Sequence, residues 1–171
     1  MEAKKILVTG TFNSGKTQFV REASDIDIVT TERRITEPQD AQVKEETTVA
    51  MDYGQVRVGK RLLHLYGTPG QARFEFMWEI LARDMDAFIL LVDSEDRGSL
   101  IEVIHIMRVL RKRSKVPYLI AANKQDRRKA LSPTEIARLL KVGKSVPVVS
   151  CIARDGQSVR RVLERTIELL T

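Results

Sequence analysis

A glycine-containing octapeptide constrains this chain more than any other feature. Gly10–Thr17 reads Gly-Thr-Phe-Asn-Ser-Gly-Lys-Thr and directly follows the apolar run Ile6–Val8. Its glycines let the backbone curl, so that successive N–H groups and the start of the next helix surround a phosphate. Lys16 places a positive charge beside the β and γ oxygens, and the Thr17 hydroxyl is suited to bind Mg²⁺. The motif predicts a strand, a phosphate-binding loop and a helix, in that order.

A second motif indicates which base the chain binds. The segment Ala121–Asp126 follows another apolar stretch and contains Asn123, Lys124 and Asp126. An ionised aspartate only accepts hydrogen bonds, so Asp126 is suited to the N1–H and N2–H₂ donors of guanine. Adenine lacks this pair of donors, and a carboxylate left unpaired disfavours binding. A phosphate loop alone would also fit a kinase or an ATPase, but the two motifs together predict a protein that binds GTP or GDP.

Length and composition predict one domain, 1–171, with a core of its own. The longest apolar run, Ala87–Val92, is too short to cross a bilayer, and the sequence shows neither a signal peptide nor a lipid-attachment pattern. The single cysteine, Cys151, cannot form an internal disulfide, which fits a reducing compartment. We therefore expect a cytoplasmic protein without a transmembrane segment.

Positive charge is concentrated in the second half of the chain. Residues 1–86 contain 12 Lys and Arg against 14 Asp and Glu, whereas residues 87–171 contain 17 against 9. The basic residues cluster in 108–115 and 124–129. Such a face suits weak contact with an anionic membrane or an acidic partner, and a solvated surface is the alternative. Nucleic acid is not expected as a partner, because no aromatic residues alternate with these charges.

Apolar runs alternate with helical patterns, as in successive βαβ units. The pattern predicts an α/β fold of the P-loop NTPase type, with a six-stranded, mostly parallel sheet, one antiparallel strand and helices on both faces. Strands are expected near 4–9, 47–58, 61–66, 87–93, 117–122 and 146–150. Helices are expected near 16–23, 71–84, 97–113, 133–141 and 157–170.

One hairpin interrupts this alternation. Two strand patterns flank Gly59-Lys60, a two-residue turn with Gly at its first central position, as a type II′ turn requires. Such a turn places Val58 opposite Arg61, and the same register then places Asp52 directly opposite Gly67.

The motifs and their order resemble those of the Ras-like small GTPases. The resemblance rests on the phosphate loop, Thr48, the turn Thr68–Gln71 and the guanine motif, and it extends over essentially the whole chain. Thr47–Gly54 and Gly67–Gln71 look like the prokaryotic branch, which includes the gliding-polarity GTPases and the small GTPases associated with roadblock-domain proteins. The resemblance implies a small G-protein fold, GTP or GDP with Mg²⁺ as cofactors, and a roadblock-domain protein as regulator or effector.

The same resemblance implies how the chain senses and hydrolyses GTP. Thr48 matches a threonine that reaches Mg²⁺ only when a γ-phosphate is present, with its neighbour Thr47 as the alternative. Gly70 matches the residue whose N–H senses the γ-phosphate, and Gln71 matches the residue that orients the attacking water. The expected catalytic residues are Gln71, Lys16 and Thr48.

The resemblance to the family also implies which residues of this chain bind the base. The Ala153 N–H matches a donor to guanine O6, and Arg154 is placed to lie over the base. The expected nucleotide-binding residues are Asn13, Ser14, Gly15, Lys16, Thr17, Gln18, Gly70, Asn123, Lys124, Asp126, Cys151, Ile152, Ala153 and Arg154.

The chain departs from the family pattern in its phosphate loop and in its base-binding turn. Phe12 and Asn13 replace small residues and crowd the space where an arginine from a partner would enter. Ile152 replaces a serine that normally steadies the base-binding aspartate, which predicts weaker nucleotide affinity.

A third departure is the longer first switch. The spacing between Thr17 and Thr48 exceeds that of typical relatives, and the extra segment Ile26–Ile35 alternates enough to form an added strand.

The fourth departure is Gly67, which replaces the aspartate that usually holds a water on Mg²⁺. Because Asp52 is expected opposite Gly67, its carboxylate could lean into the vacant space and hold that water instead. The expected metal-binding residues are therefore Thr17, Thr48 and, through water, Asp52. The alternative is that Asp52 is an ordinary strand residue.

The sequence thus predicts a molecular switch that hydrolyses GTP to GDP slowly and depends on an activator for faster turnover. In the expected helix after Gln71, Phe76 and Ile80 point away from the core stripe and are candidate partner contacts; the alternative is that they pack under the neighbouring helix. Phe12 and Gly67 keep an alternative open, a GTP-loaded scaffold with negligible hydrolysis. Gln71 argues against that alternative.

Overall fold

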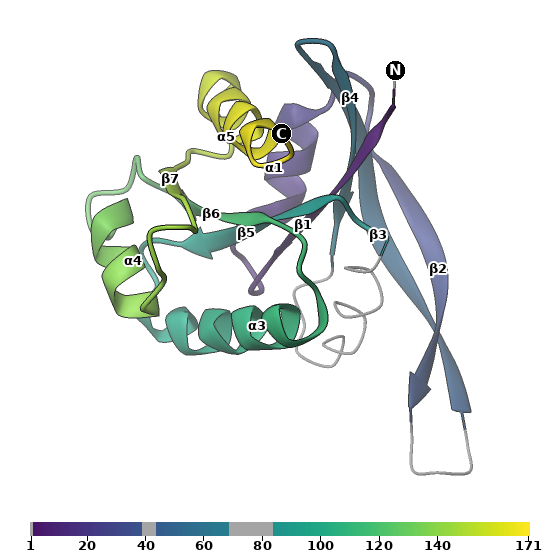
Figure 1. Cartoon of the computed structure of the whole chain (residues 1–171), viewed down its shortest axis with the longest axis horizontal. Coiled ribbons are helices and arrows are strands. Elements are labelled where there is room, and N and C mark those ends of the chain that lie inside the picture. The colour runs from purple at the N-terminus through teal and green to yellow at the C-terminus, as the bar shows by residue number, and fades with distance from the viewer. Residues whose placement is uncertain (1, 39–43, 69–83) are drawn as a thin grey trace.

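The computed structural model describes the backbone of residues 2–38, 44–68 and 84–171, and the side chains of these ranges outside 31–50 and 113. The described strands form one seven-stranded sheet with the order β2-β3-β4-β1-β5-β6-β7 (Figure 1). The strands are β1 (Lys4–Gly10), β2 (Val29–Pro38), β3 (Lys44–Val58), β4 (Arg61–Gly67), β5 (Ala87–Asp93), β6 (Tyr118–Asn123) and β7 (Val148–Ser150). The helices are α1 (Lys16–Ala23), the 3₁₀ turn η2 (Arg97–Ser99), α3 (Leu100–Arg113), α4 (Pro133–Leu140) and α5 (Gly156–Glu168).

The strand directions confirm the expected fold class. β1 pairs in parallel with β4 and β5, and β5, β6 and β7 continue the parallel order. β3 is antiparallel to both of its neighbours, β2 and β4, so it alone runs against the rest of the described sheet. The seventh strand is β2, formed by the extra segment before the first switch, three residues further along than the expected 26–35. Together, β2 and β3 make a ribbon that extends away from the body of the molecule (Figure 1).

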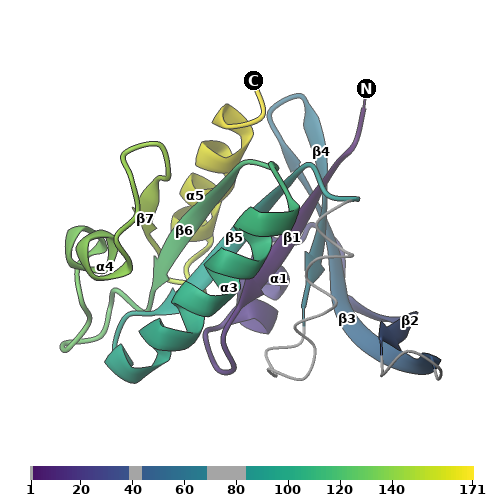
Figure 2. The same ribbon diagram turned by 60° about the horizontal axis from the view of Figure 1, so that its bottom comes forward.

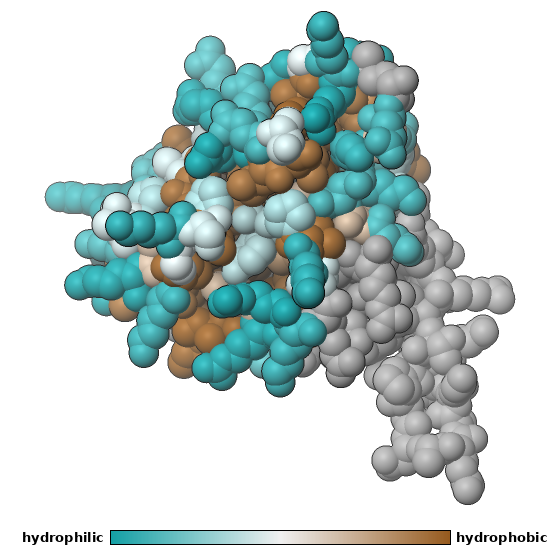
Figure 3. Space-filling view, viewed as in Figure 1, coloured by the Kyte–Doolittle hydropathy of each residue, from teal (hydrophilic) through white to brown (hydrophobic). Residues whose placement is uncertain are grey.

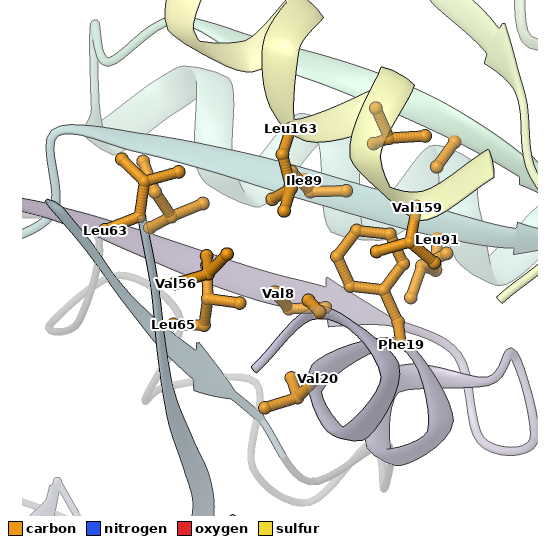
Figure 4. Close-up of a cluster of buried hydrophobic side chains, with 14 of the residues drawn as sticks. Val8, Phe19, Val20, Val56, Leu63, Leu65, Ile89, Leu91, Val159 and Leu163 are labelled. Carbon is orange, nitrogen blue, oxygen red and sulfur yellow. The ribbon is translucent and has the colours of Figure 1, made fainter. Parts of the chain in front are cut away.

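Helices cover the two faces of the sheet and bury one core on each (Figure 2). On one face α1 and α5 pack their apolar side chains against the central strands, as the cluster around Phe19, Val159 and Leu163 shows (Figure 4). On the other face α3 and α4 bury residues such as Val103, Leu110 and Ile136. Figure 3 shows hydrophilic side chains around these helices, with smaller apolar patches between them. The two cores hold the carboxyl ends of the parallel strands in fixed positions.

The hairpin between β3 and β4 has the expected turn and register. Gly59 has a φ of +60°, whereas Lys60 is not among the residues with positive φ, which is the type II′ pattern. Val58 lies opposite Arg61, and the ladder continues to Asp52 opposite Gly67. The prediction of this register is confirmed.

The expected helices differ from the structure in detail. The segment 97–113 begins with the 3₁₀ turn, in which Asp96 accepts a hydrogen bond from the Ser99 N–H, and becomes α-helical only at Leu100. The expected helix 71–84 lies almost entirely outside the described residues. In the described ranges, no helix has the length and apolar character needed to span a membrane.

Candidate nucleotide-binding site

The phosphate loop joins β1 to α1, and Lys16 closes it from inside. The Lys16 Nζ donates to the Thr11 carbonyl at 2.6 Å, the Gly10 carbonyl at 3.1 Å and the Ser14 hydroxyl at 3.4 Å. Lys16 is only 8% exposed, and this burial lowers its pKa from 10.5 to about 8. The loop therefore holds at its centre a cation that donates to three oxygen atoms of the same loop, and these bonds could be exchanged for bonds to an anionic group.

Asn123 connects the phosphate loop to the turn after β7 through two hydrogen bonds. Its Nδ2 donates to the Ser14 carbonyl at 2.9 Å, and its Oδ1 accepts from the Ala153 N–H at 2.9 Å. Gly15 has a φ of +102°, and a Cβ at this position would come within 2.4 Å of the Asn123 Nδ2. A side chain at Gly15 would therefore both strain the loop and push Asn123 away.

Lys124 makes a second tie to the same loop. Its Nζ donates to the Asn13 carbonyl at 3.1 Å and to the Asp93 carboxylate at 2.7 Å. Asn13 adopts a φ of +65°, a conformation that asparagine tolerates better than most residues. Two neighbouring residues of the guanine motif thus support the phosphate loop, which the sequence analysis did not anticipate.

A cavity of about 450 Å³ opens beside the phosphate loop. Its lining includes Lys16 and Thr17 from the start of α1, Asp52 from β3 and Gly67 from the end of β4. The Thr17 hydroxyl donates to the Asp52 Oδ2 at 2.6 Å. A Cβ at Gly67 would lie 3.4 Å from the Asp52 Cβ and equally close to the Val20 Cγ2, so Asp52 is the polar side chain next to the space that the glycine leaves.

The oxygen atoms in this cavity fit a Mg²⁺ ion. Mg²⁺ prefers hard oxygen ligands and usually keeps several waters, with one or two protein groups and phosphate oxygens completing its shell. Thr17 and Asp52 provide one hydroxyl and one carboxylate. Within the described residues, no group of three or more His, Cys, Asp or Glu side chains could hold a metal ion.

A second cavity, of about 130 Å³, adjoins the first at Gly15 and Gln18, which line both. Asp126 and Arg154 also line it, and the Arg154 guanidinium donates a hydrogen bond to the Asp126 carboxylate. This hydrogen bond lowers the pKa of Asp126 below its ordinary value, so the carboxylate is ionised. The carboxylate expected to bind guanine is therefore an ionised group that lines the second cavity.

The turn after β7 forms the far wall of this cavity. The Ile152 N–H donates to the Ser158 hydroxyl at 2.8 Å, and the Ala153 N–H, expected to bind guanine O6, donates to Asn123. Cys151 is buried, and burial raises the pKa of its thiol to about 12. Cys151 therefore shapes the turn as a neutral, unreactive side chain.

The structure does not bring every expected site residue into the cavities. The backbone of Thr48 is paired with Arg34 in the β2–β3 ladder, four residues along β3 from Asp52. At about 3.3 Å per residue, the Cα atoms of Thr48 and Asp52 are separated by about 13 Å. Gly70 and Gln71 lie outside the described residues, as do Phe76 and Ile80.

Three residues near the site were not singled out by the sequence analysis. Arg21 lines the larger cavity, Asp93 binds Lys124, and Ser158 holds the turn after β7. Thr68, which also lines the larger cavity, was named there only as part of a turn. Only Asp93 had a usable signal, because it ends an apolar strand at the edge of the sheet where ligands of α/β proteins bind.

Comparison with known proteins gives a consistent family. The model of the family described as "Arf: ADP-ribosylation factor family" matches residues 1–170. ADP-ribosylation factor-like protein 3 of Caenorhabditis elegans is 33% identical over 139 residues, covering 80% of this chain and 68% of that protein. ADP-ribosylation factor-related protein 1 of Bos taurus is 28% identical over 168 residues, covering 93% of this chain and 81% of that protein. An uncharacterised protein of Methanocaldococcus jannaschii is 39% identical over 79 residues, but that match covers only half of its length.

Solved structures agree on the fold. The Arl6 BBS3 small GTPase of Trypanosoma brucei, bound to the nucleotide analogue GppNp, superposes with a TM-score of 0.75 at 21% identity and covers 99% of this chain and 98% of its own. The G domain of the FeoB iron transporter of T. maritima superposes with a TM-score of 0.69 at 18% identity, covering 99% and 100%. At these identities the likeness concerns the fold alone.

Proposed function

This chain belongs to the ADP-ribosylation factor family of small GTPases, and from that premise we propose that it is a switch that binds GTP and hydrolyses it slowly to GDP. The observation that carries the proposal is the pair of adjoining cavities, one beside the phosphate loop and one beside Asp126. Gly15 and Gln18 line both, so a single molecule with a phosphate end and a base end would span them.

The larger cavity would receive the phosphates. Lys16 already lies inside the loop as a cation, and its bonds to two carbonyls and one hydroxyl would be exchanged for bonds to phosphate oxygens. Mg²⁺, when bound there, would neutralise charge on the β- and γ-phosphates. The Thr17 hydroxyl is the protein ligand that this chain offers to the ion.

Asp52 would take the role of the aspartate that Gly67 replaces. Three observations support this assignment: Asp52 lies opposite Gly67 in the ladder, its Cβ borders the space at Gly67, and its carboxylate accepts a hydrogen bond from Thr17. A carboxylate bonded to the ligand of a metal orients that ligand and can hold a metal-bound water.

The switch would require a change in the β2–β3 ribbon. Thr48 cannot bind an ion held at Thr17 while it remains paired with Arg34, because about 13 Å of strand separates it from Asp52. Binding of a γ-phosphate would therefore have to release Thr48 from this part of the ladder. A ligand can shift such an equilibrium only by its difference in affinity for the two states. The contacts of Thr48 and of the Gly70 N–H would supply that difference.

Hydrolysis would depend on Gln71, which we propose orients the attacking water. Unaided turnover of related switches is slow, on the order of 10⁻⁴ to 10⁻² per second. Replacing Gln71 by Leu keeps the side-chain volume but removes the amide, so the single-turnover rate should fall at least about tenfold with GTP affinity nearly intact. Equal rates for the two proteins would move catalysis to another residue. Negligible release of phosphate by both would favour a GTP-loaded scaffold, which the exposed Phe12 at the mouth of the cavity would suit.

We propose two kinds of partner for this chain, a regulatory protein and an anionic membrane surface. We propose a roadblock-domain protein as regulator or effector, in contact with the face of Phe76 and Ile80, on the strength of the resemblance to prokaryotic small GTPases. A weak contact with an anionic membrane is also compatible with the exposed cations Arg108, Arg111 and Lys115, since none of these three forms an ion pair within the described residues.

A further inference from the structure

The carboxylate proposed to read guanine already has a partner in this structure. Arg154, from the turn before α5, donates to the Asp126 Oδ2 across the smaller cavity, and both side chains line that cavity. The Asp126 side chain is 27% exposed and that of Arg154 is 66% exposed, so the pair lies at the mouth of the cavity. Among the described residues, Arg154 provides the only side-chain hydrogen bond to this carboxylate.

The two groups that compete for Asp126 are chemically alike. Guanine presents N1–H and N2–H₂ donors from one planar, nitrogen-rich edge, and the guanidinium of arginine presents adjacent N–H donors in a similar plane. Either edge can donate to both oxygens of one carboxylate. Arginine carries a full positive charge in addition, so it satisfies Asp126 without a base. Ile152, in the same turn, offers no hydroxyl to the carboxylate.

We propose that Arg154 is an internal substitute for the guanine edge, which occupies Asp126 in the empty protein and must be displaced when a guanine nucleotide enters. The inference rests on the proposed function. Displacement costs part of the binding free energy, which lowers the association rate. When the base leaves, recapture of Asp126 by Arg154 prevents the carboxylate from remaining unpaired. Arg154 thus sets the balance between the empty and the loaded states.

The test is the association rate of fluorescently labelled GDP with nucleotide-free protein. For Arg154→Ala we expect an increase of about threefold, as for loss of a partly exposed charge pair, with a tighter equilibrium affinity. Arg128→Ala is the matched control, because Arg128 is an exposed arginine of the neighbouring loop that does not line the cavity. An increase in both variants would indicate a general charge effect and would overturn the proposal. An unchanged or slower association rate in Arg154→Ala would also overturn the proposal. Faster dissociation with weaker affinity would overturn it too, and would indicate that Arg154 instead covers the bound base.

A second measurement does not depend on nucleotide. The pKa of the Asp126 carboxyl, followed by NMR in the empty protein, should rise towards its ordinary value in Arg154→Ala and remain low in Arg128→Ala. An unchanged pKa would contradict the pairing even if GDP binds. If the pKa rises but the unsubstituted protein binds no guanine nucleotide, the pair exists but the proposed function fails, and the role assigned to Arg154 fails with it.

Discussion

The two halves of the site are built in different ways. The phosphate half is centred on one continuous segment, the loop Gly10–Thr17, in which buried Lys16 is bonded to the backbone and hydroxyl groups of its own loop. The base half combines two loops far apart in the sequence, and its central contact is the exposed pair of Asp126 and Arg154. A buried cation held by its own loop is expected to contribute more binding free energy than a pair shared with solvent. The phosphate half should therefore determine whether a nucleotide binds, and the base half which nucleotide.

The largest expected effect follows from removing the cation of the phosphate half. Lys16→Ala should weaken binding of both GTP and GDP at least about 100-fold, because it deletes a charge-assisted phosphate contact. Equilibrium titration with labelled nucleotides measures the effect, with Lys129→Ala, on the exposed surface, as the control. A loss of nucleotide affinity of less than about tenfold would contradict the claim that the phosphate half determines whether a nucleotide binds.

A smaller effect is expected at the metal-binding edge of the same half. Asp52→Ala should raise the Mg²⁺ concentration needed for tight GTP binding several-fold, since Thr17 would lose the carboxylate that orients it. Adding Gly67→Asp to that variant should restore part of the loss. The space at Gly67 permits this, because its Cβ would meet its nearest atoms at 3.4 Å, and Gly67 is not among the residues with positive φ.

The metal titration is compared for the unsubstituted protein, Asp52→Ala and the double variant. Identical curves for the first two would contradict the role of Asp52. Loss of GTP binding in Asp52→Ala at every Mg²⁺ concentration would instead indicate that Asp52 is needed for the phosphate loop to fold.

The smallest effect concerns pH. Because burial lowers the pKa of Lys16 to about 8, the empty folded protein binds fewer protons than the unfolded chain between about 8 and 10.5. The free energy of unfolding should therefore rise with pH across this window, and this rise should be absent in Lys16→Met. Phosphate binding favours the charged lysine, so nucleotide affinity should fall as pH rises above about 8.

Calorimetry in two buffers of different ionisation enthalpy measures this effect directly. Binding of GDP about one pH unit above the pKa of Lys16 should take up a proton. No proton uptake would indicate that Lys16 is already fully charged in the empty loop.

The features that could be predicted from the sequence are those that neighbouring residues determine, such as a turn or an alternating strand. The register of β3 and β4 was predicted to the residue, because a two-residue turn at Gly59 permits one pairing and that pairing carries Asp52 to Gly67. The added strand was expected from its alternation, but its limits, Val29–Pro38, depend on pairing with β3.

The contacts between loops could not be predicted in this way. The bonds of Lys124 to Asp93 and of Arg154 to Asp126 join segments that only the parallel sheet brings together, and no spacing in the sequence marks them. The hydrogen bonds from Lys16 to its own loop could not be predicted either, because a phosphate would compete for the same ammonium group. The sequence therefore indicates the chemistry of the site, whereas the structure shows which hydrogen bonds a ligand would replace.

The most direct test of the account is the base preference of Asp126→Asn. We expect the unsubstituted protein to prefer GTP over xanthosine triphosphate, because the ionised carboxylate accepts from the two donors of guanine. Asparagine presents a donor to the additional carbonyl of xanthine, so the preference of the variant should reverse by at least about tenfold, in line with the cost of an unpaired polar group. Competition of the two nucleotides for each protein gives the ratio in one experiment. Guanine preference that persists unchanged in Asp126→Asn would contradict the assignment of base recognition to Asp126, and an unsubstituted protein without guanine preference would contradict the proposal of a guanine-nucleotide switch.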